Sequence, residues 1–332
     1  MKTFSNFQLK DITTFHIPAT AEHYVEYESI EELKSILSQI ETNKILHTGG
    51  GSNLLFTGDF KGYVLHSEIR FIDVVHEDND SIILNVGSGV EWDEFVQYCV
   101  DHSYYGIENM SYIPGEVGAS AVQNIGSYGA EVKDVIYKVH TVETGSCTER
   151  IFDNDECNYA YRYSIFKGEL KGKYIVTSVE YKLSKIKQFN LTYGPLKAIE
   201  SPSLTLSDVR NEIIRIRTAK LPDPKYIGSV GSFFKNPVVP ESKYIELNQS
   251  YPGIPHYLVD GNMYKIPAGW LIEHAGLKGY TVGDAKVYEK QCLVIVNNGK
   301  ATASDVVQLY THIIDTVRLK YGINLEPEAN II

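Results

Sequence analysis

Residues 113–130 form a stretch of small side chains that suits close contact with a flat ligand. The segment IPGEVGASAVQNIGSYGA has four glycines, three alanines and two serines, and Glu116 is its only charged residue. Such a backbone can approach a planar ring closely. The amides of Gln123 and Asn124 suit hydrogen bonds to ring carbonyls and ring nitrogens. A tightly packed core segment of small residues would have the same composition, so the stretch alone does not decide between ligand binding and packing.

A second group of glycines follows a short apolar run earlier in the chain. Residues 45–47, which we expect to form a strand, lead towards the segment GGGSN at residues 49–53. Consecutive glycines can direct several backbone N–H groups to one point, which is one way of holding a pyrophosphate without cationic side chains. The segment is not a G-x-G-x-x-G dinucleotide motif, because Leu54 stands where its last glycine would be. Taken alone, these residues favour a plain glycine loop.

Two further segments combine polar residues with aromatic ones. Residues 159–164 (YAYRYS) place Arg162 among three tyrosines. A cation packed among tyrosines is more often a fixed charge than the solvated arginine of an exposed strand edge. Residues 228–237 are expected to form a second polar glycine loop that carries Ser232 and Asn236. On local grounds Ser232 is better explained as a loop hydroxyl that bonds nearby backbone.

The composition is that of an ordinary globular protein and excludes several classes. The 332 residues are 43% hydrophobic and 22% charged, enough for about two domains or more of roughly 150 residues each. The net charge of −11 argues against binding to nucleic acid or to an anionic membrane. The four cysteines lack C-x-x-C spacing, so we expect reduced thiols, no metal site and a cytoplasmic location. No segment resembles a signal peptide or is apolar for long enough to span a membrane.

Residue spacing predicts the elements that must position these segments. Ser29 and Glu32 form a capping box ahead of a helix that continues to about Ile40. Pro222 and Pro224 cannot continue a helix, so we predict a domain boundary at residues 220–224. Strands are expected at 81–86, 134–144, 173–185 and 293–296, with a strand-like tail at 325–332. Helices are expected at 92–99, from Thr205 or Ser207 to Ala219, at 268–274 behind Pro267, and at 304–321 with Val307, Tyr310, Ile314 and Val317 as its apolar stripe and Gly322 as its stop.

Five of these motifs together resemble the family of UDP-N-acetylenolpyruvoylglucosamine reductases (UDP-N-acetylmuramate dehydrogenases), flavoenzymes of bacterial cell-wall synthesis. The motifs are residues 49–53, 113–129, 161–162, 220–236 and 325–328. One such motif would be weak, whereas five in the right order cover essentially the whole chain. The segment LTYGPL at residues 191–196 also resembles the loop of the longer subclass, which closes a tyrosine, here Tyr193, over the substrate. Without the resemblance, Tyr193 would be an ordinary turn tyrosine.

The resemblance implies an α+β fold that binds FAD. It consists of a two-part FAD-binding fold of the vanillyl-alcohol oxidase type and a C-terminal α/β substrate-binding domain. Residues 1–68, completed by residues 320–332, would form the first FAD-binding part, residues 69–219 the second, and residues 220–319 the substrate-binding domain. FAD would be the cofactor, with NADPH and a UDP-sugar as small-molecule substrates. A bacterial cytoplasmic monomer is expected, with no nucleic-acid partner and no membrane insertion.

The resemblance also implies roles for single residues. The reaction would be NADPH-dependent reduction of UDP-N-acetylglucosamine enolpyruvate to UDP-N-acetylmuramate, with hydride passing from reduced flavin to the terminal enolpyruvyl carbon. Ser232 would donate the proton to the adjacent carbon, while Arg162 and Glu328 would stabilise the enolate. The implied substrate contacts are Tyr161, Tyr193, Lys220 and Asn236. The implied cofactor contacts are Gly49, Gly50, Gly51, Ser52, Asn53, Pro114, Gly115, Gly118, Ala119, Gln123, Asn124, Gly126, Tyr128 and Gly129.

Two other functions remain open. A flavin-dependent alcohol or sugar oxidase of the same fold would leave Lys220, Ser232 and Asn236 without a task. A nucleotide-binding protein that had lost turnover would not need the three catalytic residues intact. The family pattern also changes directly after Glu328, at Ala329, so we expect an altered rate before an altered reaction.

Overall fold

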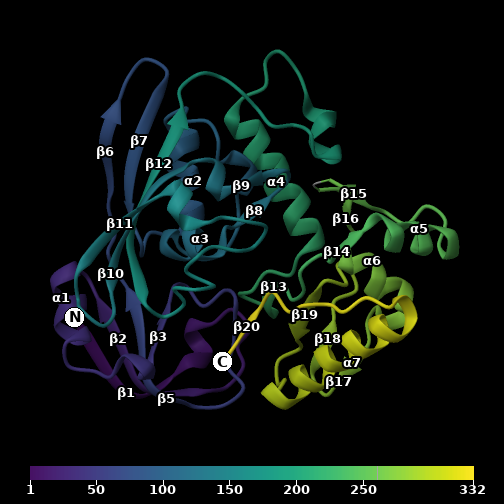
Figure 1. Ribbon diagram of the computed structural model, residues 1–332, viewed down its shortest axis with the longest axis horizontal. Coiled ribbons are helices and arrows are strands. Elements are labelled where there is room, and N and C mark those ends of the chain that lie inside the picture. Colours follow the sequence, from purple (N-terminus) through teal and green to yellow (C-terminus); the bar gives the residue numbers. More distant parts are fainter. Residues whose placement is uncertain (260) are drawn as a thin grey trace. The chain divides into compact units, whose positions relative to one another are not determined.

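The computed structural model describes residues 1–259 and 261–332, which divide into two compact units (Figure 1). Each unit has its own hydrophobic core, and the chain passes between the units several times. Unit 1 consists of Met1–Phe7, Ala21–Gly51 and Phe60–Thr218. Unit 2 consists of Gln8–Thr20, Ser52–Asp59 and Ala219–Ile332.

Helices and strands alternate irregularly along the described residues. The α-helices are α1 (Ile30–Leu37), α2 (Trp92–Asp101), α3 (Val117–Gln123), α4 (Leu206–Lys220), α5 (Glu241–Ser250), α6 (Ala268–Ile272) and α7 (Ala303–Tyr321). The strands mainly in unit 1 are β1 (Lys2–Gln8), β2 (Thr20–Tyr27), β3 (Ile45–Thr48), β5 (Phe60–Ser67), β6 (Ile72–Glu77), β7 (Ser81–Gly87), β8 (Gly126–Ser127), β9 (Ala130–Glu131), β10 (Ile136–Glu143), β11 (Glu149–Asp153) and β12 (Tyr174–Ser184). Those in unit 2 are β4 (Leu54–Leu55), β13 (Gly228–Ser232), β14 (Val238–Pro240), β15 (Tyr257–Leu258), β16 (Met263–Lys265), β17 (Thr281–Val282), β18 (Ala285–Val287), β19 (Val294–Asn297) and β20 (Asn330–Ile331).

Unit 1 is built on two sheets. The smaller has the order β1-β2-β5-β3, and β5 runs parallel to both β2 and β3. The larger has the order β11-β10-β12-β7-β6 and is antiparallel (Figure 1). Helices α2 and α3 share one core with β7, β10 and β12. The strands predicted at 81–86, 134–144 and 173–185 are therefore confirmed, and all three belong to this sheet.

The predicted first helix is confirmed, although it is shorter than expected. The Ser29 hydroxyl accepts a hydrogen bond from the Glu32 N–H at 3.2 Å, as a capping box requires. The Glu32 carboxylate, however, accepts from the N–H of Glu28 instead of that of Ser29. The helix ends at Leu37, before the predicted Ile40. The helix predicted at 92–99 is confirmed as α2, and it buries Trp92, Phe95, Val96, Cys99 and Val100.

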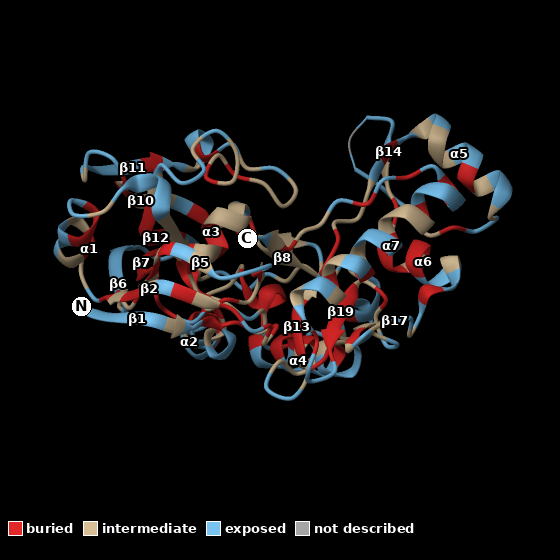
Figure 2. Cartoon of the chain, turned by 90° about the horizontal axis from the view of Figure 1, so that it is seen from below, coloured by how far each residue is buried: buried red, intermediate tan, exposed pale blue. Residues whose placement is uncertain are grey.

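Unit 2 packs two small sheets and the three helices α5, α6 and α7 around a single core. One sheet has the order β13-β19-β18-β17, and the other has the order β14-β16-β15. Strand β19 is buried along its whole length (Figure 2), which confirms the strand predicted at 293–296. Helix α6 begins directly after Pro267, as predicted. A π-helical turn (Glu273–Leu277) then ends this segment, with Gly276 at φ 84°.

The apolar stripe predicted for α7 is confirmed at Val317 and is wrong by one residue at its other three positions. Val307, Tyr310 and Ile314 are only half-buried. Valines occupy both 306 and 307, and isoleucines both 313 and 314, so the spacing fits two helix faces about 100° apart. Leu309 is spaced for the same face as Val306 and Ile313, and this face is the buried one. The inward side chains are Val306, Leu309, Ile313, Val317 and Tyr321. The stop at Gly322 is confirmed by its left-handed φ of 65°.

Two segments near the predicted site also differ from expectation. Residues 228–232 form strand β13 instead of a loop. A Cβ on Gly228 would lie 2.4 Å from the carbonyl oxygen of Phe15, so this glycine permits close packing of two backbones. In the tail only β20 is a strand, paired in parallel with β4, while Pro327 forms an isolated bridge with Phe234.

The cysteines and the helices were both expected to fit a protein without disulfides or membrane spans. All four cysteines are free, as expected. Among residues 1–259 and 261–332, no helix combines the length and the apolar character needed to cross a bilayer.

Candidate active site

The glycine segment forms a tight turn directly after β3, as predicted. The Gly51 N–H donates to the Gly49 carbonyl at 2.6 Å, and Gly51 has a φ of 61°. That conformation is unfavourable for residues with a Cβ. The Thr48 hydroxyl donates to the same Gly49 carbonyl at 2.9 Å. Residues 49–51 belong to unit 1, and Ser52 begins a segment of unit 2.

The small-residue stretch contains a short helix, α3, that the sequence did not predict. The side chain of Glu116, the residue before α3, makes no capping hydrogen bond to the helix. The Val117 N–H instead donates to the Val90 carbonyl at 2.9 Å, and the Gly118 N–H to the Ser88 carbonyl at 3.0 Å. Part of the stretch is therefore a packed core segment, since Val117, Gly118, Ser120 and Ala121 are buried. Pro114, Gly115, Ala119, Gln123, Gly126 and Tyr128 remain at least partly accessible.

Gly118 is expected to be needed for packing. A Cβ at this position would lie 2.8 Å from the Cβ of Ser88, closer than such atoms pack. We expect Gly118→Ala to lower the free energy of unfolding by about 1–2 kcal/mol, although alanine favours the helix by up to about 1 kcal/mol. Urea denaturation of the apoprotein measures this. The control is Gly145→Ala, because Gly145 has no atom within 4 Å of the added Cβ; equal losses in both variants would contradict the packing role.

A tight hairpin follows α3, with the half-buried Tyr128 and the exposed Gly129 at its tip. Strands β8 and β9 are joined by these two residues, whose φ values are 49° and 84°, as a two-residue hairpin turn requires. The buried Asn109 amide donates to the Tyr128 carbonyl at 3.0 Å and to the Asn190 carbonyl at 2.8 Å. The Asn190 amide in turn donates to the Gly129 carbonyl at 2.9 Å. The hairpin tip is thus tied to the segment that carries Tyr193.

Arg162 lies at a two-residue turn and is directed to the end of α3. Ala160 and Tyr163 exchange backbone hydrogen bonds of 3.0 and 3.1 Å, and Arg162 has a left-handed φ of 54°. Its Nη2 donates to the Gly126 carbonyl at 2.7 Å and its Nη1 to the Asn124 carbonyl at 3.4 Å. The Arg162 Cζ also lies 5.5 Å from the centre of the Tyr161 ring. The expected fixed cation is therefore present and is joined to the small-residue stretch.

The side-chain amides of Gln123 and Asn124 make different hydrogen bonds. The Asn124 side chain is buried and donates to the Ala160 carbonyl at 2.8 Å, while its oxygen accepts from the Lys133 N–H at 3.1 Å. The Gln123 oxygen accepts from the Lys167 ammonium group at 2.7 Å. The structure thus gives Asn124 a packing role, whereas Gln123 is partly accessible.

Tyr193 packs against Tyr128 with their ring centres 5.0 Å apart and their planes at 81°. Tyr193 comes directly before a 3₁₀ turn (Gly194–Ile199) that buries Leu196 against the core of α4. Burial raises the pKa of Tyr128, and the nearby Arg217 charge opposes this effect. Tyr193 and Tyr128, which are both predicted site residues, are therefore in contact.

Arg217 on α4 is a candidate site residue that was not predicted from the sequence. Its Nε donates to the Tyr112 carbonyl at 3.1 Å, and burial lowers the pKa of its guanidinium. Arg210, two turns earlier, is buried and makes paired hydrogen bonds of 2.6 and 2.9 Å to the Asp93 carboxylate. Two arginines seven residues apart share a helix face, and that spacing was the available signal.

In unit 2, Ser232 and Glu328 come from segments that pair with each other. Ser232 is exposed at the end of β13, after Gly231 with φ 69° and a register shift opposite β19. The next residue, Phe233, is buried, and its carbonyl accepts from the Glu328 N–H at 2.8 Å. The Glu328 carbonyl accepts from the Asn53 amide at 3.2 Å. Three predicted site residues distant in sequence are thereby brought together.

Asn236 and Lys220, two further predicted residues of unit 2, are each associated with the end of a helix. The Asn236 side-chain oxygen accepts from the N–H of Ala268, the first residue of α6, at 2.9 Å. This bond satisfies one of the N–H groups left open at a helix start. Lys220 is the last residue of α4 and is exposed. Arg162, Tyr161 and Tyr193 belong to unit 1.

A hydrogen-bonded histidine–glutamate pair in unit 1 was not predicted from the sequence. The Nε2 of His66 lies 2.8 Å from the Glu116 carboxylate, which is only 5% exposed. Glu116 was noticed as the single charge of the small-residue stretch, but its partner lies 50 residues away. The local sequence gives no signal for this pairing.

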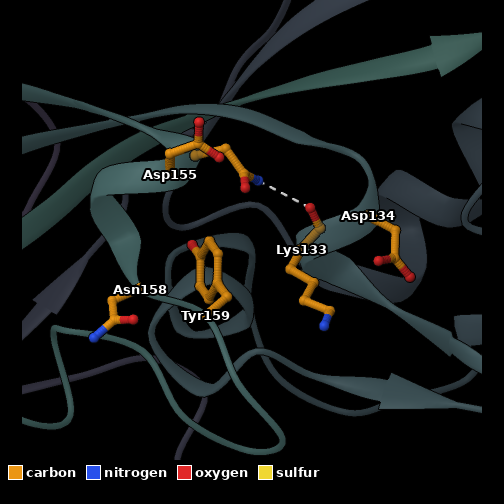
Figure 3. A pocket seen from close by; sticks show the side chains of 6 residues that line it. Lys133, Asp134, Asp155, Asn158 and Tyr159 are labelled. Carbon is orange, nitrogen blue, oxygen red and sulfur yellow. Dashed lines mark hydrogen bonds between the residues drawn. The ribbon is translucent and has the colours of Figure 1, made fainter. Parts of the chain in front are cut away.

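A polar pocket of about 320 Å³ lies elsewhere in unit 1 (Figure 3). The Asn154 amide donates to the Lys133 carbonyl at 2.9 Å across this pocket. Burial strongly raises the pKa of the Tyr159 hydroxyl. The lining residues are Lys133, Asp134, Asn154, Asp155, Asn158 and Tyr159, and none of them is a predicted site residue.

Comparison with known proteins defines the class first. The sequence model of the FAD binding domain matches residues 21–147, which include the glycine turn, α3 and the Tyr128 hairpin. The chain therefore contains an FAD-binding domain. The model of the C-terminal domain of UDP-N-acetylenolpyruvoylglucosamine reductase matches residues 223–332, where Ser232, Asn236 and Glu328 lie.

Full-length relatives define the family. The chain is 47% identical over 329 residues to the UDP-N-acetylenolpyruvoylglucosamine reductase of Bacteroides fragilis, covering 98% of this chain and 99% of the relative. It is 45% identical to that of Porphyromonas gingivalis, covering 98% of each. The crystal structure of the Thermus caldophilus reductase aligns with a TM-score of 0.70 at 25% identity, covering 99% of this chain and 98% of that one. The chain belongs to the UDP-N-acetylenolpyruvoylglucosamine reductase family, and the predicted α+β class is confirmed.

Proposed function

We propose that this protein reduces UDP-N-acetylglucosamine enolpyruvate to UDP-N-acetylmuramate with NADPH, as a step of peptidoglycan precursor synthesis. The observation that carries the proposal is the 47% identity to a reductase of that name over nearly the full length of both chains. Bound FAD supplies the two-electron carrier between NADPH and the sugar nucleotide. The alternative of an alcohol or sugar oxidase is not favoured, because the C-terminal match is to the reductase domain.

The residues present fit FAD. The tight turn at residues 49–51 holds its left-handed conformation at a glycine, and such turns can bind a pyrophosphate through backbone N–H groups. The partly accessible Gly115, Ala119 and Gly126 leave room for a flat ring beside the backbone. We therefore place the pyrophosphate at residues 49–53 and the flavin ring along residues 114–129.

Three side chains are proposed to perform the chemistry. Arg162, whose guanidinium is held by two backbone carbonyls, would stabilise negative charge on the substrate carboxylate side. Ser232, exposed at the end of β13, would donate the proton, and Glu328, anchored through its N–H to Phe233, would support the enolate. Tyr161, Tyr193, Lys220 and Asn236 are the proposed substrate contacts; a lysine and an amide suit diphosphate or carboxylate oxygens.

We propose the domain division that the resemblance implies: residues 1–68 with 320–332, residues 69–219, and residues 220–319. The family matches support the boundary near residue 220, since one ends at residue 147 and the other begins at residue 223, on either side of α4. The cytoplasmic location and the monomeric state stay predictions.

An absorption spectrum is the first test of this function. The purified protein is expected to be yellow, to bleach with NADPH under anaerobic conditions, and to recover its colour when the enolpyruvyl sugar nucleotide is added. Recovery with oxygen after reduction by an alcohol or a sugar would favour the oxidase instead. A colourless protein that cannot be reconstituted with FAD would overturn the proposal.

A further inference from the structure

The buried pair of His66 and Glu116 lies directly behind the glycine turn. His66 is near the end of β5, where it is the register partner of Thr48 on β3. Thr48 is the last residue before the turn, so the imidazole is fixed beside the point where the turn begins. Its Nε2 lies 2.8 Å from the Glu116 carboxylate.

The Glu116 carboxylate faces the glycines themselves. A Cβ on Gly49 would lie 3.1 Å from Glu116 Oε2, and a Cβ on Gly50 would lie 3.4 Å from Oε1. The backbone on both sides of Glu116 is held, because the Gly115 carbonyl accepts from the Trp92 N–H and the Val117 N–H donates to Val90, both at 2.9 Å. The carboxylate therefore fills the space behind Gly49 and Gly50.

A carboxylate at this place needs a compensating positive charge. Burial raises the pKa of Glu116, and its hydrogen bond to His66 opposes that effect. Burial lowers the pKa of His66, but Glu116 and two further carboxylates outweigh burial and raise it overall. The pKa values of both groups are raised, which favours retention of a proton within the pair. The titratable groups that face it are Tyr24, Glu26 and Tyr27 on β2, His47 on β3, Glu68 after β5, and Glu91 before α2.

We propose that His66 is a positioning residue for the cofactor: it supplies the charge that allows the Glu116 carboxylate to support a turn that binds a pyrophosphate. This proposal rests on the placement of the FAD pyrophosphate at residues 49–53. Without His66, a buried carboxylate would stand unpaired behind the turn. This carboxylate and the pyrophosphate of FAD would then be two negative groups close together in a poorly solvated place, and they would repel each other strongly.

Replacement of His66 is expected to weaken FAD binding more than replacement of Glu116. His66→Gln leaves Glu116 uncompensated, so we expect the FAD dissociation constant to rise roughly tenfold or more. Glu116→Gln keeps the shape and removes the charge, so a change within about threefold is expected. The double variant, with both residues replaced by Gln, is expected to recover most of the affinity lost by His66→Gln. A purely structural role would give no such recovery.

The measurement is titration of the apoprotein with FAD, followed by quenching of flavin fluorescence, with thermal unfolding of each apoprotein as the check on folding. The chain offers a matched control in His140 and Glu180, another partly buried pair in unit 1 with 2.7 Å between Nε2 and Oε1. His140→Gln is expected to leave the dissociation constant within about twofold. If His66→Gln weakens FAD no more than His140→Gln, the positioning role is overturned.

A variant of the turn distinguishes this inference from the placement of FAD. Gly51→Val opposes the left-handed φ of 61° and is expected to weaken FAD binding strongly. Unchanged affinity in Gly51→Val would overturn the placement itself. Weakening by Gly51→Val together with normal affinity in His66→Gln would overturn only the role of His66.

The unmodified protein provides a second measurement if His66→Gln does not fold. Deprotonation of His66 leaves the pair with a net negative charge, so FAD affinity is expected to fall as the pH rises through its raised pKa. The double variant lacks both groups and is expected to lose this part of the pH dependence. An affinity that falls equally in both proteins over that pH range would contradict the proposal.

Discussion

Replacement of Ser232 by alanine is expected to slow reoxidation of the reduced protein by the enolpyruvyl sugar nucleotide by about 100-fold or more. Bleaching by NADPH is expected to stay near normal, because that step needs no proton for the substrate carbon. Serine is a poor acid at its ordinary pKa, so its use requires a strongly basic carbon in a site that excludes water. The exposed hydroxyl after the Gly231 bulge is the group proposed to meet that carbon.

Stopped-flow absorbance separates the two half-reactions. The control is Ser229→Ala, which removes the same hydroxyl three residues earlier on β13, where the side chain is buried. This variant is expected to reoxidise at nearly the normal rate. Equal slowing of both half-reactions in Ser232→Ala would contradict the assignment of Ser232 as the proton donor.

Arg162→Lys is expected to lower turnover by about 100-fold, comparable to the loss of one group that stabilises an oxyanion. Lysine keeps the positive charge but cannot reproduce the planar fork that donates to the Gly126 and Asn124 carbonyls. A single ammonium group would be less well fixed towards the substrate. Steady-state turnover with saturating NADPH and substrate is the measurement, and FAD content should be unchanged.

The matched control is Arg150→Lys. Arg150 also packs on an aromatic ring, with its Cζ 4.0 Å from the centre of the Phe152 ring, but it is exposed on β11 and is not a predicted site residue. Its replacement is expected to leave turnover within about twofold. Normal turnover in Arg162→Lys would show that the positive charge alone is sufficient, or that Arg162 is not the cation of the site.

Elements with strong periodicity could be predicted from the sequence, whereas elements formed by distant contacts could not. The buried face of α2 and the start of α6 at Pro267 follow from spacing and proline geometry. Helix α3 has a glycine at its second position and no side-chain cap, so local propensity does not favour it. Its first N–H groups are satisfied by Val90 and Ser88, which are almost 30 residues away in the sequence.

The same division applies to the site. The glycine turn after β3 is local, and the sequence indicated it correctly. The approach of Glu328 to the strand of Ser232 depends on a backbone hydrogen bond to Phe233, which only the folded chain creates. The two hydrogen bonds from Arg162 to the end of α3 are likewise invisible in a pattern of neighbouring residues. The resemblance to a family supplied the roles of these residues, and local chemistry alone did not.

The division of unit 2 into separate chain segments has a consequence for synthesis on the ribosome. All segments of unit 1 have been made once Thr218 has emerged. Strand β4, in contrast, pairs with β20 at residues 330–331, which are translated long after β4. Until then Phe15 and Leu55, both buried in the finished core of unit 2, lack their partners. The nascent chain therefore carries two unfinished apolar segments through most of its translation, and these are where a chaperone would be needed.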